Sequence, residues 1–200
     1  MPLLEEDAPR DPFVLFDRWF REAVDAGAPQ PDAMTLATSG EEGVSARMVL
    51  LKGIQDGAFL FYSNYSSRKG RDLSWDRGAA LVFYWAVTRH QVRVSGTVRK
   101  VGRAATQEYF HSRPRGAQLS ALASRQSHIV RSREVLESRV AELAAQYPDE
   151  VPVPKHWGGY ALRPSWIEFW ENRDDRLHDR LRYVFRSAFT GAWRIERLAP

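Results

Sequence analysis

The chain has 200 residues, 44% of them hydrophobic, which fits one globular domain with a sizeable core. It contains no cysteine, so disulfides, thiolate nucleophiles and cysteine-based metal sites are excluded. The formal net charge of +4 suits anionic ligands from a phosphate ester to RNA. Neither the HExxH spacing of zinc hydrolases nor a GxGxxG or GxxxxGK[ST] nucleotide motif is present.

The ends and apolar runs of the chain indicate where the protein resides. The N-terminus, MPLLEEDAPRDP, is acidic and lacks the basic-then-apolar order of a signal peptide. No apolar run approaches the roughly 18 residues that a membrane span needs. We therefore expect a cytoplasmic protein with neither a membrane nor a nucleic acid as partner, and no metal site.

The first predicted element is a helix over 11–26. Asp11 is suited to the N-cap, Pro12 to the first helical position and Gly27 to the stop. The helical spacing predicts a buried stripe made of Phe13, Phe16, Phe20 and Val24.

Short β-type runs separated by turn residues follow. We expect strands over 34–38, 45–52, 58–63, 79–86 and 90–101. A short helix over 66–75, opened by serines, lies between two of them. This pattern is typical of an antiparallel meander or barrel.

The second half of the chain first turns helical and then returns to β structure. We expect helices over 103–111, 116–123 and 132–146, the last with a stripe of Leu136, Val140, Leu143 and Ala144. A Pro/Gly connector over 151–159 leads into strands over 160–171, 176–185 and 192–198. The fold class is therefore α+β, mainly β, built round an antiparallel sheet or barrel. We expect one domain over 1–200, with 1–10 as a flexible N-terminal segment.

Basic residues mark both ends of the apolar strand RMVLLK (47–52). Strict alternation puts Arg47 and Lys52 on opposite faces. They serve one ligand only if the strand twists, bulges near Gly53, or the ligand wraps its edge. The alternative is two side chains that reach solvent from the strand ends.

A second basic group, Ser66-Ser67-Arg68-Lys69, opens the predicted helix over 66–75. A helix N-terminus offers unpaired N–H groups, and serines donate to phosphate oxygens. Cations in a first turn oppose the helix dipole unless an anion is bound there. A capped surface helix is the alternative.

Two further groups of polar residues could serve a ligand. Tyr109 and Arg113 are four apart, so on a helix they share a face and can clamp a phosphate, although an Arg-rich helix end is the alternative. Gln91 could hydrogen-bond a heterocycle, although a solvated strand face explains it as well. The tetrapeptide 125–128 by itself indicates only a loop.

On the later strands, Trp166, Glu168 and Trp170 share one face, and we expect three basic residues to share a face of the next strand. These are Arg176, His178 and Arg180. They repel one another unless nearby acids or an anionic ligand compensate. The acids Asp174, Asp175 and Asp179 are the simpler explanation, and a bound phosphate or electron-rich ring is the other.

Nine segments in order resemble the pyridoxamine 5′-phosphate oxidase family, between about Asp11 and Pro200. They are RMVLLK (47–52), FYSNYSSRKG (61–70), RHQVRVSG (89–96), YFHSRPRGAQ (109–118), SRQS (124–127), WGGY (157–160), IEFW (167–170), RLHDR (176–180) and WRIERLAP (193–200). The resemblance implies a split β-barrel that binds flavin mononucleotide (FMN) at the interface of a homodimer.

The resemblance also implies roles for individual residues. FMN contacts, some supplied by the partner subunit, are expected from Arg47, Met48, Val49, Leu50, Leu51, Lys52, Tyr62, Ser63, Ser67, Arg68, Lys69, Gln91, Gln126, Ser127, Trp170 and Arg180. A clamp on the substrate phosphate is expected from Lys52, Tyr109 and Arg113. Arg176 and His178 are expected over the substrate pyridine ring, where they orient the reacting carbon.

The implied activity is oxidation of pyridoxamine or pyridoxine 5′-phosphate by dioxygen, giving pyridoxal 5′-phosphate and hydrogen peroxide. A hydride passes from the substrate 4′ carbon to FMN. Three features depart from the family. The N-terminus lacks the basic, Tyr-containing segment that can close over the substrate, Ala117 replaces a serine that often joins the phosphate clamp, and 182–193 is longer and more apolar than a plain hairpin needs.

Three other functions stay open at this point. A related flavin oxidase could act on another planar substrate, as in phenazine biosynthesis, although Lys52, Tyr109 and Arg113 would then lack their phosphate. A non-catalytic flavin- or haem-binding barrel would not need Arg176 and His178. A nucleic-acid-binding barrel would gather its basic residues in one stripe, whereas here acids are interspersed.

Overall fold

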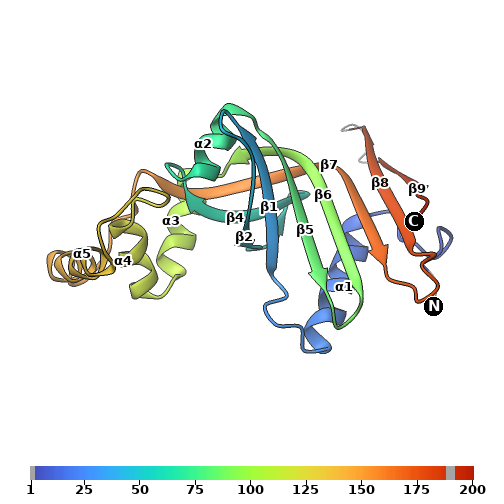
Figure 1. The fold of residues 1–200 in the computed structure, drawn as a ribbon, viewed down its shortest axis with the longest axis horizontal. Helices are drawn as coiled ribbons and strands as arrows, with labels where there is room; N and C mark the ends of the chain where they lie inside the picture. Colours follow the sequence, from blue (N-terminus) through green and yellow to red (C-terminus); the bar gives the residue numbers. More distant parts are fainter. Residues whose placement is uncertain (1–2, 188–191) are drawn as a thin grey trace.

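The computed structural model describes residues 3–187 and 192–200 (Figure 1). Its elements follow in the order α1 (Pro12–Asp25), β1 (Ala33–Gly40), β2 (Gly43–Leu50), β3 (Ile54–Gln55), β4 (Ala58–Asn64), α2 (Arg68–Trp75), β5 (Gly78–Trp85), β6 (His90–Lys100), α3 (Arg103–Ser112), α4 (Arg115–Ala123), α5 (Arg133–Gln146), β7 (Trp157–Glu171), β8 (Asp179–Ser187) and β9 (Ala192–Arg197). Within the described residues, no helix is long and apolar enough to cross a membrane.

The strands form one antiparallel sheet that divides at β7. Its order is β2-β1-β5-β6-β7-β4-β3, while β8 pairs with the later part of β7 and β9 pairs with β8. At the division β7 carries an extra residue, Ser165, because Ser95 pairs with Trp166 while Gly96 pairs with Pro164, which has no N–H to donate. A Cβ on Gly96 would lie 2.1 Å from the Arg163 carbonyl oxygen, so only glycine fits there.

Helix α1 covers the main core. Asp11 caps it by accepting a hydrogen bond from the Phe13 N–H, as expected. The predicted stripe is only partly correct, because Val24 is exposed and the fully buried positions are Leu15, Phe16, Trp19 and Ala23. Phe13 and Phe20 pack at the margin of this core. Phe16 is buried as expected, whereas Leu15, Trp19 and Ala23 form the rest of the buried face in place of Val24.

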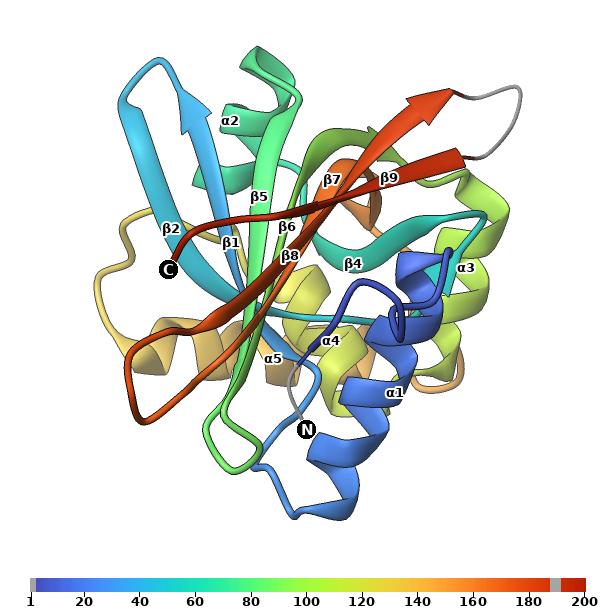
Figure 2. The same ribbon diagram turned by 90° about the vertical axis from the view of Figure 1, so that its right-hand side faces the viewer.

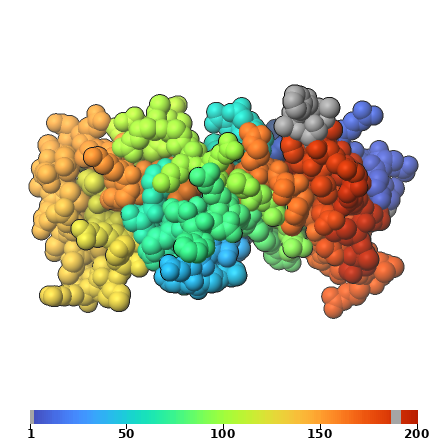
Figure 3. All heavy atoms as spheres, turned by 90° about the horizontal axis from the view of Figure 1, so that it is seen from above, coloured from blue at the N-terminus to red at the C-terminus, as the bar shows by residue number. Residues whose placement is uncertain are grey.

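Helices α3, α4 and α5 enclose a second, smaller core at the opposite end of the molecule from β8 and β9 (Figures 1 and 3). Its buried members are Phe110, Leu119, Leu143, Val151 and Trp157. Val140 and Ala144 pack against it, which confirms the inward face predicted for α5. The bundle therefore stands beside the sheet and can form one wall of a cavity.

The structure corrects one prediction that bears on the site. The strand expected over 176–185 begins only at Asp179, so Arg176 and His178 lie in the β7–β8 loop, residues 172–178. Arg176 has φ +67, and the Leu177 N–H donates to the Asp175 carboxylate at 2.9 Å. This acid-rich turn breaks the period-two pattern, so the alternation argument does not hold there. The two-residue strand β3 was also not expected.

Residues 3–10 lie against the C-terminal hairpin formed by β8 and β9, which faces the viewer in Figure 2. Leu3 is buried, and its N–H donates to Asp179. Glu5 forms an ion pair with Arg197 at 2.7 Å. The flexibility expected for 1–10 stays a prediction. Within the long apolar run 182–193, residues 188–191 lie outside the described part of the chain.

Candidate active site

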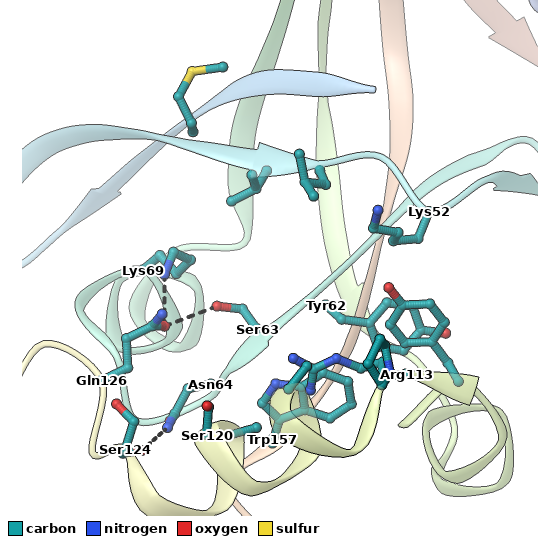
Figure 4. Close-up of a pocket in the computed structure, with 17 residues that line it drawn as sticks. Lys52, Tyr62, Ser63, Asn64, Lys69, Arg113, Ser120, Ser124, Gln126 and Trp157 are labelled. Atoms are coloured by element: carbon teal, nitrogen blue, oxygen red, sulfur yellow. Dashed lines mark hydrogen bonds between the residues drawn. The ribbon is translucent and has the colours of Figure 1, made fainter. Parts of the chain in front are cut away.

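A cavity of about 590 Å³ opens between the end of β2, strand β4, the start of α2 and helices α3 and α4 (Figure 4). Many residues predicted for cofactor or substrate line it: Met48, Val49, Leu50, Lys52, Tyr62, Ser63, Lys69, Tyr109, Arg113 and Gln126. Residues far apart in the sequence thus meet in one cavity, lined by both apolar and cationic side chains.

Lys69 supplies the buried cation at one end of the cavity. It lies in the first turn of α2, where the Ser67 hydroxyl caps the helix by accepting from the Gly70 N–H at 3.3 Å. Its Nζ donates to Gln126 Oε1 at 3.0 Å, and the Ser63 hydroxyl donates to the same oxygen at 3.3 Å (Figure 4). Burial and the nearby Arg47 lower the pKa of Lys69. A buried cation whose hydrogen-bond partners, Ser67 and Gln126, are neutral fits an anionic ligand.

Arg47 on β2 lies near enough to Lys69 to affect its pKa but is not among the described residues that line the cavity, and it is held by a buried carboxylate. Its guanidinium donates to Thr38 at 2.6 Å and lies 3.5 Å from Asp72. Asp72 also accepts from Thr38 at 2.7 Å and Ser45 at 2.9 Å. Burial opposes ionisation of Asp72, but these hydrogen bonds and Arg47 hold the pKa of its carboxyl below the usual range. Asp72 therefore keeps Arg47 in place.

Stacked aromatic rings and Arg113 form the other end of the cavity. The rings of Tyr62 and Tyr109 stack with centroids 3.8 Å apart, and Tyr109 lies nearly parallel to Trp157 at 6.2 Å. The Arg113 guanidinium lies 4.8 Å from the Trp157 ring centroid. Its Nη1 is buried and has no hydrogen-bond partner within the described chain. Such a donor fits the oxygen of an anion.

Lys52 completes this second cationic position. The chain leaves β2 after Leu50, and Gly53 takes φ +123, a conformation that favours glycine. The alternation that placed Arg47 and Lys52 on opposite faces therefore does not extend to Lys52, which lines the cavity and pairs with Asp32 at 3.0 Å. The cavity thus has two separate cationic regions, one at Lys69 and one at Lys52 and Arg113.

Some predicted residues lie close to the cavity without lining it. Leu51 is buried in the core, and Ser67 is buried in the cap of α2. Arg68 lies 3.9 Å from Glu42. Ser127 directly follows Gln126 and has φ +70.

Five predicted residues lie elsewhere, towards the β8–β9 end: Gln91, Trp170, Arg176, His178 and Arg180. We call them the loop cluster. In the sheet Trp170 lies opposite both Gln91 and Arg180, and its ring is 4.8 Å from that of His178. Arg180 donates to Glu168 at 2.8 Å and 3.0 Å. None of the five is among the described residues that line the cavity of the same chain.

The sequence did not reveal some residues that shape the cavity. Trp157 was noted only as part of a motif, yet it supports both Tyr109 and Arg113. Asn64 also lines the cavity and holds α4 nearby by donating to the Ser124 carbonyl at 3.3 Å. Their contact partners lie far away in the sequence, and such long-range contacts leave no local signal.

Comparisons with known proteins agree with this geometry. A family model described as pyridoxamine 5′-phosphate oxidase matches residues 20–147, and one described as the pyridoxine 5′-phosphate oxidase C-terminal dimerisation region matches 157–200. A pyridoxine/pyridoxamine 5′-phosphate oxidase of Salinibacter ruber is 54% identical over 95% of this chain and 89% of its own. One of Burkholderia mallei is 50% identical over 97% of this chain and 91% of its own.

Two solved structures share the fold of this chain. PhzG from Burkholderia lata 383, determined with tetrahydrophenazine-1-carboxylic acid, is 33% identical, with a TM-score of 0.91 over 99% of this chain and 98% of its own. A pyridoxamine 5′-phosphate oxidase-related, FMN-binding protein from Nostoc punctiforme shares the fold, with a TM-score of 0.72 at 18% identity over 96% of this chain and 98% of its own.

The divided antiparallel sheet defines the class as a split β-barrel, and its cavity is lined in part by cationic side chains. The predicted fold class is confirmed. Both family models and the close relatives agree beyond the fold, and the chain belongs to the pyridoxamine 5′-phosphate oxidase family.

Proposed function

We propose that this protein is an FMN-dependent oxidase that converts pyridoxamine or pyridoxine 5′-phosphate into pyridoxal 5′-phosphate, with dioxygen reduced to hydrogen peroxide. The observation that carries the proposal is one cavity with two separate cationic regions, Lys69 at one and Lys52 with Arg113 at the other. Two phosphorylated molecules, cofactor and substrate, match this arrangement. The names of relatives at 50% and 54% identity support the same reaction.

The Lys69 end fits the phosphate of FMN. Lys69 and Arg47 supply charge, and the capped start of α2 directs backbone N–H groups towards an anion. When bound, FMN supplies hydride acceptance and reoxidation by dioxygen. The wall formed by Met48, Val49 and Leu50 would lie along the flavin and exclude water from it.

The other end fits the substrate phosphate. Arg113 offers an unpaired buried donor, Lys52 adds a second charge, and the Tyr109 side chain lines the same wall. Anchoring the phosphate there fixes the distance of the substrate ring from the flavin. The contribution of these residues to rate is therefore orientation.

We further propose a homodimer in which the loop cluster of a second copy completes the cavity. The loop cluster lies away from the cavity of its own chain, and residues 157–200 match a family region described as a dimerisation region. On β2 and β5 the apolar side chains Val44, Met48 and Tyr84 are 79%, 62% and 62% exposed, as a surface covered by another subunit would be. Arg176 and His178 of the second copy would then orient the substrate ring.

The reaction is tested by absorbance. We expect the purified protein, after reconstitution with FMN, to show a flavin spectrum that bleaches when pyridoxine 5′-phosphate is added without oxygen. Air should restore the spectrum and release peroxide. A flavin that stays oxidised would contradict the substrate assignment, and a protein that does not take up FMN would contradict the cofactor.

The shared site is tested by mixing two inactive variants, Arg113→Met and Arg176→Met. If each site draws these residues from different subunits, random mixed dimers restore about a quarter of the sites. If both residues serve the site of their own chain, the mixture stays inactive.

A second candidate is a flavin oxidase acting on a phenazine precursor. The structural similarity to PhzG and the position of Ala117 in the cavity wall favour it. Its weakness is that Lys52 and Arg113 would face a ligand without a phosphate. Comparing turnover of pyridoxine 5′-phosphate with that of a dihydrophenazine carboxylate separates the two. The cytoplasmic location, and the absence of membrane and nucleic-acid partners, stay predictions.

A further inference from the structure

The main chain of Arg173 contacts both residues expected over the substrate. Its N–H donates to Nδ1 of His178 at 3.0 Å, and its carbonyl oxygen accepts from the Arg176 N–H at 3.2 Å. The backbone of Arg173 therefore helps to fix the positions from which the side chains of Arg176 and His178 project within the β7–β8 loop. Its position matters for the ligand even though its side chain points away to another partner.

That partner is Asp179, the first residue of β8. Arg173 donates to Asp179 Oδ2 from Nε at 2.8 Å and lies 2.6 Å from it through Nη2. The carboxylate is buried and also accepts from Arg197 at 2.9 Å and from the Leu3 N–H at 3.3 Å. Burial opposes ionisation, but these contacts hold the pKa of the Asp179 carboxyl below its usual range. A charge-assisted network thus fixes Arg173 to the sheet.

The hydrogen bond to His178 determines which ring nitrogen carries the proton. Since Nδ1 accepts from a backbone N–H, the neutral imidazole must carry its proton on Nε2. The ring is also held at 4.8 Å from that of Trp170, tilted by 46°. The side chain therefore presents an N–H donor in a fixed direction.

We propose that Asp179 is a positioning residue, which acts through Arg173 to hold His178 as the Nε2–H tautomer and so makes it a hydrogen-bond donor to the bound ligand. The ligand atom that meets His178 is then an acceptor, such as a phenolate or hydroxyl oxygen or a pyridine nitrogen. This ligand rests on the proposed function, whereas the tautomer and its dependence on Asp179 do not.

The tautomer is read directly by nuclear magnetic resonance of protein labelled with ¹⁵N at histidine. The signals of His178 are identified by their loss in His178→Gln. We expect the Nε2–H pattern in the wild type and a mixture of tautomers in Asp179→Asn. The matched control is Glu196→Gln, which breaks the Arg182–Glu196 pair between β8 and β9 outside the loop and should leave His178 unchanged. If Asp179→Asn does not fold, Arg173→Gln removes the same two contacts to Asp179 Oδ2.

Kinetics give a second readout. We expect Asp179→Asn to lower kcat/KM for pyridoxine 5′-phosphate about tenfold at unchanged FMN content, and Glu196→Gln to stay within about twofold. A wild-type His178 in the Nδ1–H form, or an unchanged tautomer in both loop variants, would overturn the inference. If the wild type binds FMN but turns over no B6 vitamer, the proposed function fails, while the spectra still decide the inference.

Discussion

The ring of Tyr109 on α3 lies against the ring of Tyr62 on β4, with centroids 3.8 Å apart and planes 22° from parallel. Tyr62 belongs to the predicted cofactor contacts and Tyr109 to the substrate clamp. The stack therefore joins the helical bundle to the sheet at the point where the two proposed ligands meet. A movement of α3 would therefore affect the positions of both proposed ligands.

Substitutions should distinguish the role of the Tyr109 hydroxyl from that of its ring. Tyr109→Phe keeps the stack but loses the hydroxyl, and we expect kcat/KM for pyridoxine 5′-phosphate to fall about 10- to 100-fold, as loss of a hydrogen bond to a charged group does. Its melting temperature should stay close to that of the wild type. Tyr109→Ala loses the stack as well and should also melt lower. Equal kinetics for Tyr109→Phe and the wild type would remove the hydroxyl from the clamp.

Ala117 lines the cavity in the first turn of α4, four residues after Arg113, where a hydroxyl could reach a bound phosphate. We expect Ala117→Ser to lower KM for phosphorylated B6 vitamers several-fold, because it adds one charge-assisted hydrogen bond. Unphosphorylated pyridoxamine serves as the control substrate, and its kinetics should not change. An equal gain on both substrates would show that the hydroxyl does not act on the phosphate.

The buried charge of Lys69 should lower the stability of the protein when no FMN is bound. Its buried charge lies near Arg47, and burial lowers its pKa. Lys69→Met therefore should weaken FMN binding by about 10- to 100-fold while leaving the apoprotein at least as stable to heat. Fluorescence titration with FMN and a melting curve without it measure the two effects. The control Lys155→Met, at an exposed lysine, should change neither.

Because of His90, the free energy of unfolding should decrease as the pH falls. His90 is buried, stacks on Trp19 with centroids 3.9 Å apart, and has no hydrogen-bond partner for Nδ1 among residues 3–187 and 192–200, although the Glu22 carboxylate lies 3.8 Å from that nitrogen. Burial, aided by Arg18, lowers its pKa to about 4 from 6.5. Between those values the unfolded chain binds a proton that the folded protein does not, so stability drops as the pH falls from 6.5 to 4.

His90→Phe keeps a flat ring on Trp19 and removes this proton. Between pH 7 and pH 4.5, the wild type should lose roughly 2 kcal/mol more free energy of unfolding than the variant. Urea denaturation at the two pH values measures the difference. The same loss in both proteins would mean that His90 is not the group responsible.

Local signals predicted most of the fold. The Asp11 cap of α1 and the opening of α2 by serines follow from short-range rules, and the structure confirms them. The errors have physical causes. The stripe of α1 was predicted from the helical spacing of Phe13, Phe16, Phe20 and Val24, whereas the buried face is rotated from it, buries Ala23 and leaves Val24 in solvent.

The site was harder to predict because its supports are distant in sequence. The hydrogen bond that joins Asp72 to Thr38 spans 34 residues, and Trp157 meets Tyr109 from a strand 48 positions later. The strand expected through Arg176 and His178 was wrong, since a turn with positive φ interrupts the pattern. The resemblance to the family, by contrast, identified candidate site residues from the order of the nine sequence segments and required no structural argument.

Strand β7 carries Trp157 at the cavity and Trp170 in the loop cluster, with β4, β6 and β8 hydrogen-bonded along it. The length of β7 therefore sets the distance between the two parts of one chain that would serve different cavities in the proposed dimer. One added residue inside it would turn the side chains beyond that point to the other face and spoil both sites at once. Changes in length during evolution should therefore accumulate between α4 and α5, where no strand ladder fixes the number of residues.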